Sequence, residues 1–270
     1  MRLNKNLMKY EITNYARNMF NICYSFALPL GLALLFALIT NSADPTSTNT
    51  LLLIMFTTLV PMATMFGHAG NYSSELENGS IGRFKLFGYS EKTLLLSKMF
   101  TTLIFITLSF VIYFAVMFIA LPIAAPTAGA FITLIVFLYL FSAIFFILVH
   151  GIATLCGNYS MTYGLTLLLL MAFMGFSGFF GASTENMPHF MQVIGNAFPT
   201  FHITNDFLDF WMGGSFNFLG LILSTLGMAV FSVGVFALGV WVNKRRVMGN
   251  KTTSRFAKVL AKVLLLKPRT

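Results

Sequence analysis

The chain has 270 residues, of which 57% are hydrophobic and 9% charged, and its formal net charge is +9. This composition lies far outside the range of a soluble globular domain and predicts an integral membrane protein. The positive charge falls in loops between apolar runs, so it does not indicate nucleic-acid binding. Two cysteines, Cys23 and Cys156, are too few for a disulfide framework.

Six apolar runs are each long enough to cross a bilayer, which takes roughly 20 helical residues. A membrane-spanning segment must satisfy its backbone hydrogen bonds internally, and these runs lack the alternation of barrel strands, so they predict helices. The expected fold class is therefore an all-α integral membrane protein with six transmembrane helices. The runs cover residues 20–39, 51–69, 99–121, 130–154, 161–180 and 218–242.

Residues 1–18, before the first run, predict a helix with two unlike faces. The bases fall on one side of this helix and an apolar group falls on a neighbouring side: Arg2, Lys5, Lys9 and Arg17 against Met8, Ile12, Tyr15 and Met19. Such a helix is suited to lie along the inner membrane surface, so we expect an N-terminal interfacial helix.

The basic residues determine the expected orientation. All 17 Lys and Arg lie before the first run, in residues 71–98 or in residues 243–270. The remaining loops carry only acids, namely Asp44, Glu185, Asp206 and Asp209. Because cytoplasmic loops are enriched in Lys and Arg, both termini and residues 71–98 are expected in the cytoplasm.

Residues 71–98 are the only substantial charged interruption between the long runs. Apolar side chains at Ile81, Phe84, Leu86 and Phe87 stand among the charges, with glycines at Gly79, Gly82 and Gly88. One interpretation is a short helix lying across the membrane surface, and the other is a solvated loop.

Two further segments are unusual. Residues 181–217 repeat aromatic side chains between prolines and glycines, which predicts short helices dipping into the outer leaflet; an aromatic-rich surface cap is the alternative. In residues 243–270, the bases Arg255, Lys258 and Lys262 fall opposite an apolar side, which predicts a basic amphipathic helix. Its partner is expected to be anionic membrane lipid, with a protein groove as the competing possibility.

The sequence lacks the residue patterns expected for nucleotide binding, for an ion relay and for catalysis. It has no G-x-x-x-x-G-K-[ST] nucleotide loop, and no acid or base in the central part of any run for an ion relay. His68 and His150 are interpreted as separate interfacial residues near inner helix ends. No catalytic, cofactor-binding or metal-binding residues are therefore assigned, and the chain is not expected to be an enzyme.

In their order, these segments resemble the permease, or transmembrane subunit, of ABC-2 type ABC exporters over about residues 6–242. The residues that carry the likeness are Glu75-Leu76-Glu77-Asn78-Gly79-Ser80, Arg83, Lys85, Gly88-Tyr89-Ser90, Leu95-Leu96-Ser97-Lys98 and, outside, Phe198-Pro199 with Phe207, Asp209 and Phe210. The resemblance implies a transmembrane domain over residues 1–242 in a bacterial cell membrane, followed by a cytoplasmic tail over residues 243–270.

The resemblance also implies a coupling helix within residues 71–98 that docks in a cleft of a separate ATP-binding subunit. The residues implied at that contact are Glu75, Glu77, Arg83 and Lys85 as polar partners, Ile81, Phe84 and Phe87 as the apolar anchor, and Gly79 and Gly88 at the turns. Short re-entrant helices are implied in residues 181–217, with Phe198, Pro199, Asp206, Phe207, Asp209 and Phe210. ATP and magnesium are expected in the partner subunit, and a second permease copy or a paralogue is expected to complete the path.

The function expected on this basis is outward, ATP-driven movement of an apolar or amphipathic substrate, such as a drug, an antimicrobial peptide or a lipid-like molecule. Two alternatives remain open. One is a membrane immunity or binding protein that sequesters a toxin or assists a sensor without transport, and the other is an intramembrane enzyme. Copurification of a cytoplasmic ATPase would favour the transporter over both.

Overall fold

The computed structural model describes the backbone of residues 5–40, 42–179 and 188–265, and side chains as far as residue 245. The part of the chain it describes is helical, without strands. Six stretches in it are long and apolar enough to cross a membrane, which confirms the predicted number and order of the runs. They are Met19–Ile39, Pro45–Glu77, Glu91–Ala120, Ala128–Cys156, Tyr159–Phe176 and Phe218–Arg245.

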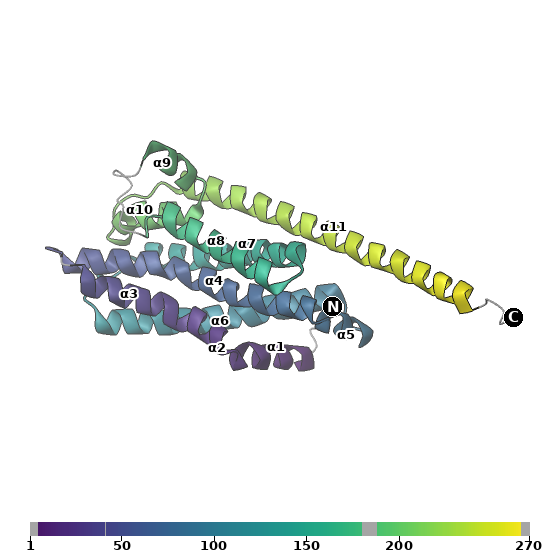
Figure 1. The fold of residues 1–270 in the computed structure, drawn as a ribbon. Helices are drawn as coiled ribbons and strands as arrows, with labels where there is room; N and C mark the ends of the chain where they lie inside the picture. The colour runs from purple at the N-terminus through teal and green to yellow at the C-terminus, as the bar shows by residue number, and fades with distance from the viewer. Residues whose placement is uncertain (1–4, 41, 180–187, 266–270) are drawn as a thin grey trace.

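The second span, α4 (Pro45–Glu77), is the central helix of the bundle. It packs against α3 (Leu28–Ile39), α6 (Glu91–Ala120), α7 (Ala128–Cys156) and α8 (Tyr159–Phe176) (Figure 1). Side chains are buried almost continuously from Asn49 to Gly70. A helix that is apolar on all sides is buried on all sides, and here neighbouring helices rather than lipid supply the contacts.

The first span contains a short irregularity. It runs through α2 (Met19–Ile22), a π-helical segment η1 (Cys23–Ala27) and α3. The amide of Leu28 donates to the carbonyl of Cys23, five residues back, and Pro29 follows without an amide hydrogen to donate. Pro61 by contrast lies inside the uninterrupted α4, where packing on every side supports the backbone.

The last span, α11 (Phe218–Leu265), is much longer than predicted. Its 48 residues reach about 70 Å, more than twice a hydrocarbon core of about 30 Å. The helix continues past residue 242, where the predicted span ends, and no proline lies between Phe218 and Pro268 to interrupt it. Against α7 the two backbones nearly touch, since a Cβ on Gly239 would lie 2.6 Å from the Gly151 carbonyl oxygen.

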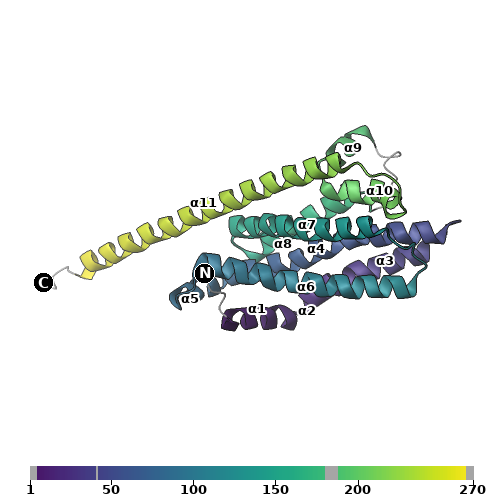
Figure 2. The same ribbon diagram turned by 180° about the vertical axis from the view of Figure 1, so that it is seen from behind.

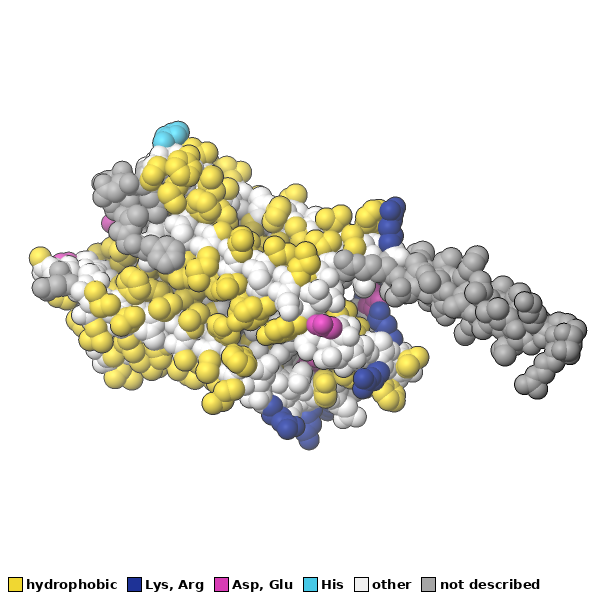
Figure 3. Space-filling view, in the orientation of Figure 1, with side chains coloured by type: hydrophobic (Ala, Val, Ile, Leu, Met, Phe, Trp, Pro, Cys, Tyr) yellow, Lys and Arg dark blue, Asp and Glu magenta, His cyan; other side chains and the backbone are white. Residues whose placement is uncertain are grey.

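The bundle has two chemically different ends (Figures 1 and 2). One end holds α1 (Lys5–Arg17), α5 (Ser80–Leu86) and the far part of α11, and Lys and Arg gather around it (Figure 3). We call it the basic end. The opposite, acidic end holds α9 (His189–Gly195) and α10 (Pro199–Trp211), with exposed Asp206 and Asp209.

The N-terminal helix α1 exists as predicted, but its orientation differs from the prediction. It runs alongside α6 in both views rather than across the ends of the spans (Figures 1 and 2). Successive contacts between α1 and α6 agree with this side-by-side arrangement. Glu11 pairs with Lys98, and one turn further along α1, Tyr15 packs on Phe105 at 4.3 Å between ring centroids. The inward face of α1 consists of Leu7, Glu11 and Tyr15, spaced four residues apart.

Candidate functional site

The connection between α4 and α6 is much shorter than the predicted segment of residues 71–98. Because α4 continues to Glu77 and α6 begins at Glu91, only residues 78–90 link them, and α5 occupies the middle. Gly79 and Gly88 flank α5 with φ angles of 69° and 88°, a left-handed conformation that favours glycine. Ser90 then caps α6 by accepting from the Thr93 amide at 3.1 Å. We call residues 78–90 the tip.

The tip carries an exposed apolar pair. Leu86 is 88% exposed and Phe87 80% exposed, and both belong to the basic end. Charged side chains surround them: Arg83 is exposed, and Lys85 forms a surface ion pair with Glu91. The tip is thus an apolar patch with a charged rim, and it contains Phe87, Arg83 and Lys85.

The other two side chains implied as the apolar anchor, Ile81 and Phe84, point elsewhere, so the three do not form one exposed anchor. Ile81 is only 7% exposed and packs in a cluster with Leu7 and Leu94. Phe84 contacts Tyr10 of α1 edge to face at 5.3 Å. Ile81 and Phe84 face the side of α5 that α1 covers, whereas Phe87, at the C-terminal end of α5, is exposed.

The two predicted acidic contacts are also occupied within the chain. Glu75 is buried and lies 2.6 Å from the ammonium of Lys98. Glu77 is exposed, and its carboxylate accepts from the Tyr159 amide at 2.9 Å, at the start of α8. These carboxylates therefore join helices to one another.

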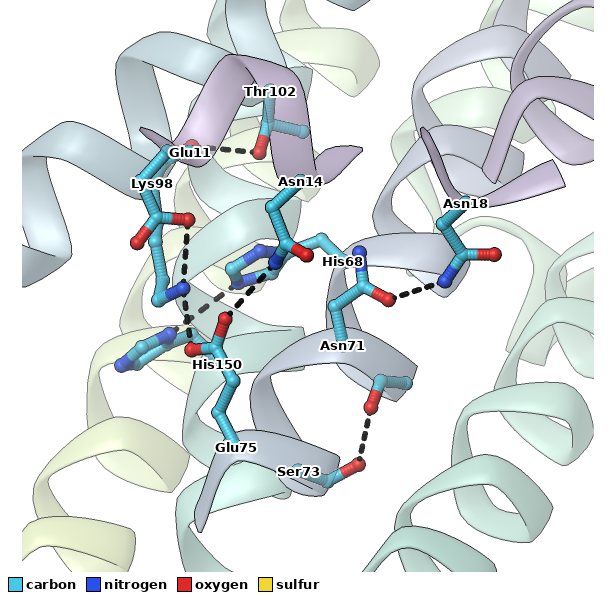
Figure 4. Close-up of polar contacts among 11 residues, drawn as sticks. Glu11, Asn14, Asn18, His68, Asn71, Ser73, Glu75, Lys98, Thr102 and His150 are labelled. Atoms are coloured by element: carbon cyan, nitrogen blue, oxygen red, sulfur yellow. Dashed lines mark hydrogen bonds and ion pairs between the residues drawn. The ribbon is translucent and has the colours of Figure 1, made fainter. Parts of the chain in front are cut away.

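Around Lys98, three helices meet in a buried ion cluster of Glu11, Glu75 and Lys98 (Figure 4). The Lys98 Nζ donates to Glu11 Oε2 at 2.9 Å and lies between the two carboxylates. Asn14 of α1 donates to Glu75 Oε1 at 3.3 Å. Charges buried this deeply persist only when paired, so the cluster fixes α1 against both helices that flank the tip.

A small cavity lies beside the ion cluster. Its lining includes Glu11, His68, Lys98 and Thr101, and it has room for about one water molecule. Glu11 Oε1 and Thr101 Oγ1 are buried without a hydrogen-bond partner from the protein. Burial raises the pKa of the Glu11 carboxyl, against the opposing attraction of Lys98.

His68 and His150, which were interpreted from the sequence as separate residues, form a pair. His68 Nε2 and His150 Nδ1 lie 3.4 Å apart, and Tyr72 stacks on His150 at 4.0 Å between ring centroids. Lys98 Nζ approaches the Tyr72 ring to 5.9 Å, which joins this aromatic group to the ion cluster. The pairing could not be predicted from the sequence because His68 and His150 are 82 positions apart, and each alone fits a helix end. Within the described residues, no group of three or more His, Cys, Asp or Glu side chains is placed to hold a metal ion.

The predicted outer segment contains two short helices, α9 and α10. Phe207 and Trp211 of α10 are fully buried, and the Trp211 indole donates to the Ala124 carbonyl at 2.8 Å. Phe198 and Pro199 begin this helix, with Phe198 against Phe173 at 4.5 Å between ring centroids. Phe210 packs among aromatic rings, while Asp206 and Asp209 remain exposed. The predicted tail bases Arg255, Lys258 and Lys262 lie outside the described side chains.

The comparison with protein families gives one result. The family model for the ABC-2 type transporter matches residues 2–210, which covers α1, the first five spans, the tip and most of α10. No curated protein matches the chain. The matched region includes the ion cluster, the predicted coupling segment of residues 71–98 and the part of the predicted outer segment up to residue 210.

Proposed function

Because the chain belongs to the ABC-2 type transporter family and is a transporter permease subunit, we propose that it serves an ATP-driven exporter whose ATP-binding subunit is a separate protein. The observation that carries this proposal is the exposed pair Leu86 and Phe87 at the basic end. ATP and magnesium would be bound by the separate subunit. A second permease copy or a paralogue would complete the path.

The tip has the composition of a docking surface. Apolar side chains that face outward along the spans are covered by lipid, but the tip connects the ends of two spans, where lipid chains do not cover it. A pair of neighbouring apolar side chains surrounded by charges is typical of a protein contact, in which a few central anchors supply most of the binding energy. Leu86 and Phe87 are the proposed anchors, with Arg83 and Lys85 as the rim.

The contacts of α5 indicate how movement of a docked subunit would reach the spans. The tip joins α4 directly to α6, and Ile81 and Phe84 connect it to α1 through Leu7 and Tyr10. A subunit that shifts on ATP binding would therefore move three helices as one body. Rigid-body movement of this kind is an established route to reorienting packed helices.

The proposed substrate is apolar or amphipathic, such as a drug, an antimicrobial peptide or a lipid-like molecule, moved outward partly along the membrane. Charged side chains within the described spans gather at their ends, as Glu75 and Lys98 do, and leave the middle of each span uncharged. The basic end is proposed to be cytoplasmic, by the positive-inside rule, and α9 and α10 are proposed as outer re-entrant helices.

The test compares two double alanine variants in cells that express the permease at matched amounts. Leu86→Ala with Phe87→Ala should lose the copurifying ATPase, identified by its nucleotide-binding sequence, because truncating a central anchor typically costs about 2 kcal/mol or more. The control is Leu38→Ala with Ile39→Ala, an equally exposed apolar pair at the acidic end, which should retain it. Undiminished ATPase on the tip variant would refute the docking role, and absence of any ATPase from the wild type would favour a binding or immunity protein.

A further inference from the structure

The charges of the buried ion cluster do not balance. Glu11 and Glu75 carry two negative charges when ionised, and Lys98 is the one base that forms an ion pair with either of them among the described residues. All three side chains are more than nine-tenths buried by residue exposure. A buried charge without a counter-charge is strongly disfavoured, and two carboxylates that share one site are a standard case in which one holds a proton.

We infer that the ion cluster is a proton-binding site: it holds one additional proton on Glu11 while α1 is docked on α4 and α6, and returns it to water when α1 moves away. The inference goes beyond the transport function proposed above and does not depend on it. The proton comes from the water at the basic end, and no other group is consumed or altered.

Glu11 rather than Glu75 is the expected position of the proton. Both oxygens of Glu75 have a partner: Asn14 donates to Oε1, and Lys98 forms an ion pair with Oε2 at 2.6 Å, although without the geometry of a hydrogen bond. Glu11 has Lys98 on Oε2 alone, while its Oε1 faces the cavity without a partner from the protein. A protonated Oε1 would become a donor, which the cavity can satisfy with Thr101 or a single water.

The other titratable groups around Glu11 come from every helix packed there. Tyr10 and Tyr15 belong to α1 itself, His68 and Tyr72 to α4, and His150 to α7. Tyr15 is engaged with Ser25 and with the Thr64 carbonyl. The hydrogen bond between the two imidazoles requires one unprotonated ring nitrogen, so at most one of them can be protonated, and the His68→Gln variant below tests that alternative.

A proton bound only in the docked state makes docking depend on pH. The carboxyl of Glu11 has a raised pKa when buried and an ordinary pKa when α1 is exposed to water. Docking is therefore favoured fully below the ordinary pKa of glutamate, and this contribution is lost as the pH rises through the raised value. Since Leu7 and Tyr10 of α1 contact α5, the bound proton also steadies the tip.

The experiment measures hydrogen exchange of the α1 amides in the full chain, in nanodiscs of zwitterionic lipid, between about pH 5 and pH 8. After correction for intrinsic exchange, protection of α1 should fall with rising pH by up to about tenfold per pH unit, the limit for one proton. Glu11→Gln, which resembles the protonated form, should keep high protection at every pH. Glu91→Gln, which removes an exposed carboxylate from a surface pair, should behave as the wild type does.

Three outcomes would overturn the inference: wild-type protection that does not change with pH, a Glu11→Gln variant that still follows the wild-type profile, or loss of the pH dependence in His68→Gln. An infrared titration of the wild type keeps the inference testable if Glu11→Gln does not fold. It should show one carboxylic acid that stays protonated at a pH where exposed glutamates are ionised, and the absence of that band would contradict the assignment.

Discussion

Replacing Lys98 is the most direct test of the buried ion cluster, because Lys98 pairs with both of its carboxyl groups. Lys98→Met keeps the length and apolar stem of the side chain but removes the ammonium between Glu11 and Glu75. Breaking a buried ion pair typically costs about 3–5 kcal/mol because it leaves an uncompensated charge. With a proton on Glu11, Glu75 is the carboxylate left without a counter-charge, so we expect a loss within that range at neutral pH, which corresponds to a melting temperature lower by about 10 °C.

The assay can use the chain's own cysteines. Cys156 is buried and Cys23 exposed, so in a Cys23→Ser background a thiol-reactive dye reports unfolding as it reaches Cys156. The matched control is Lys92→Met, the same change at an exposed position of the same helix. That control should lower stability by less than about 0.5 kcal/mol.

The charge argument also predicts how the defect of Lys98→Met is relieved. Adding Glu11→Gln and Glu75→Gln leaves the cluster without an ionisable side chain and should recover most of the lost stability. Acidification should reduce the difference in melting temperature between Lys98→Met and the wild type, because protonation neutralises a carboxylate that has lost its partner. If Lys98→Met melts at the same temperature as Lys92→Met, the cluster does not hold α1 as we describe.

Three further predictions address other parts of the chain. Single cysteines at Thr46 or Thr127 should react with an impermeant reagent added outside cells and one at Ser80 should not; the reverse pattern would invert the proposed orientation. Lys258→Glu with Lys262→Glu should weaken binding of a tail peptide to anionic vesicles, by about 1 kcal/mol per base, and equal binding to neutral vesicles would exclude lipid charge as its target. Gly239→Ala should destabilise the α7–α11 contact, whereas Gly227→Ala, which meets nothing within 4 Å, should be neutral; equal melting temperatures would show that the helices separate freely.

The six spans could be predicted from the sequence because each is a local property. A bilayer requires roughly 20 apolar residues in a helix, whatever the helix packs against, and the basic residues divide the loops into two sets. The ends of the helices could not be predicted in this way. Residues 71–77 and 91–98 are polar, which suits a loop, yet they extend α4 and α6 because Glu75 and Lys98 find partners inside the bundle.

The tip illustrates a second limit of sequence analysis. The spacing of Ile81, Phe84 and Phe87 matches one side of a helix, and the inference of a single anchor assumed that the helix is free on that side and continues to Phe87. The structure contradicts the first assumption, since α1 packs against Ile81 through Leu7 and against Phe84 through Tyr10. Leu86, which does not lie on that side of the helix, is the more exposed side chain of the pair Leu86 and Phe87.

The side chains on the inward face of α1 distinguish a helix that lies in the membrane surface from one that is packed in the bundle. A helix that lies in a membrane surface buries apolar side chains and keeps its acids in water. In α1, Glu11 lies on the buried face between Leu7 and Tyr15, and its partner is a lysine of α6. Lipid cannot replace that partner, so α1 is a packed member of the bundle at its basic end. Because α1 leads through Asn18 directly into the first span, movement of the tip has a route to that span that does not pass through α4.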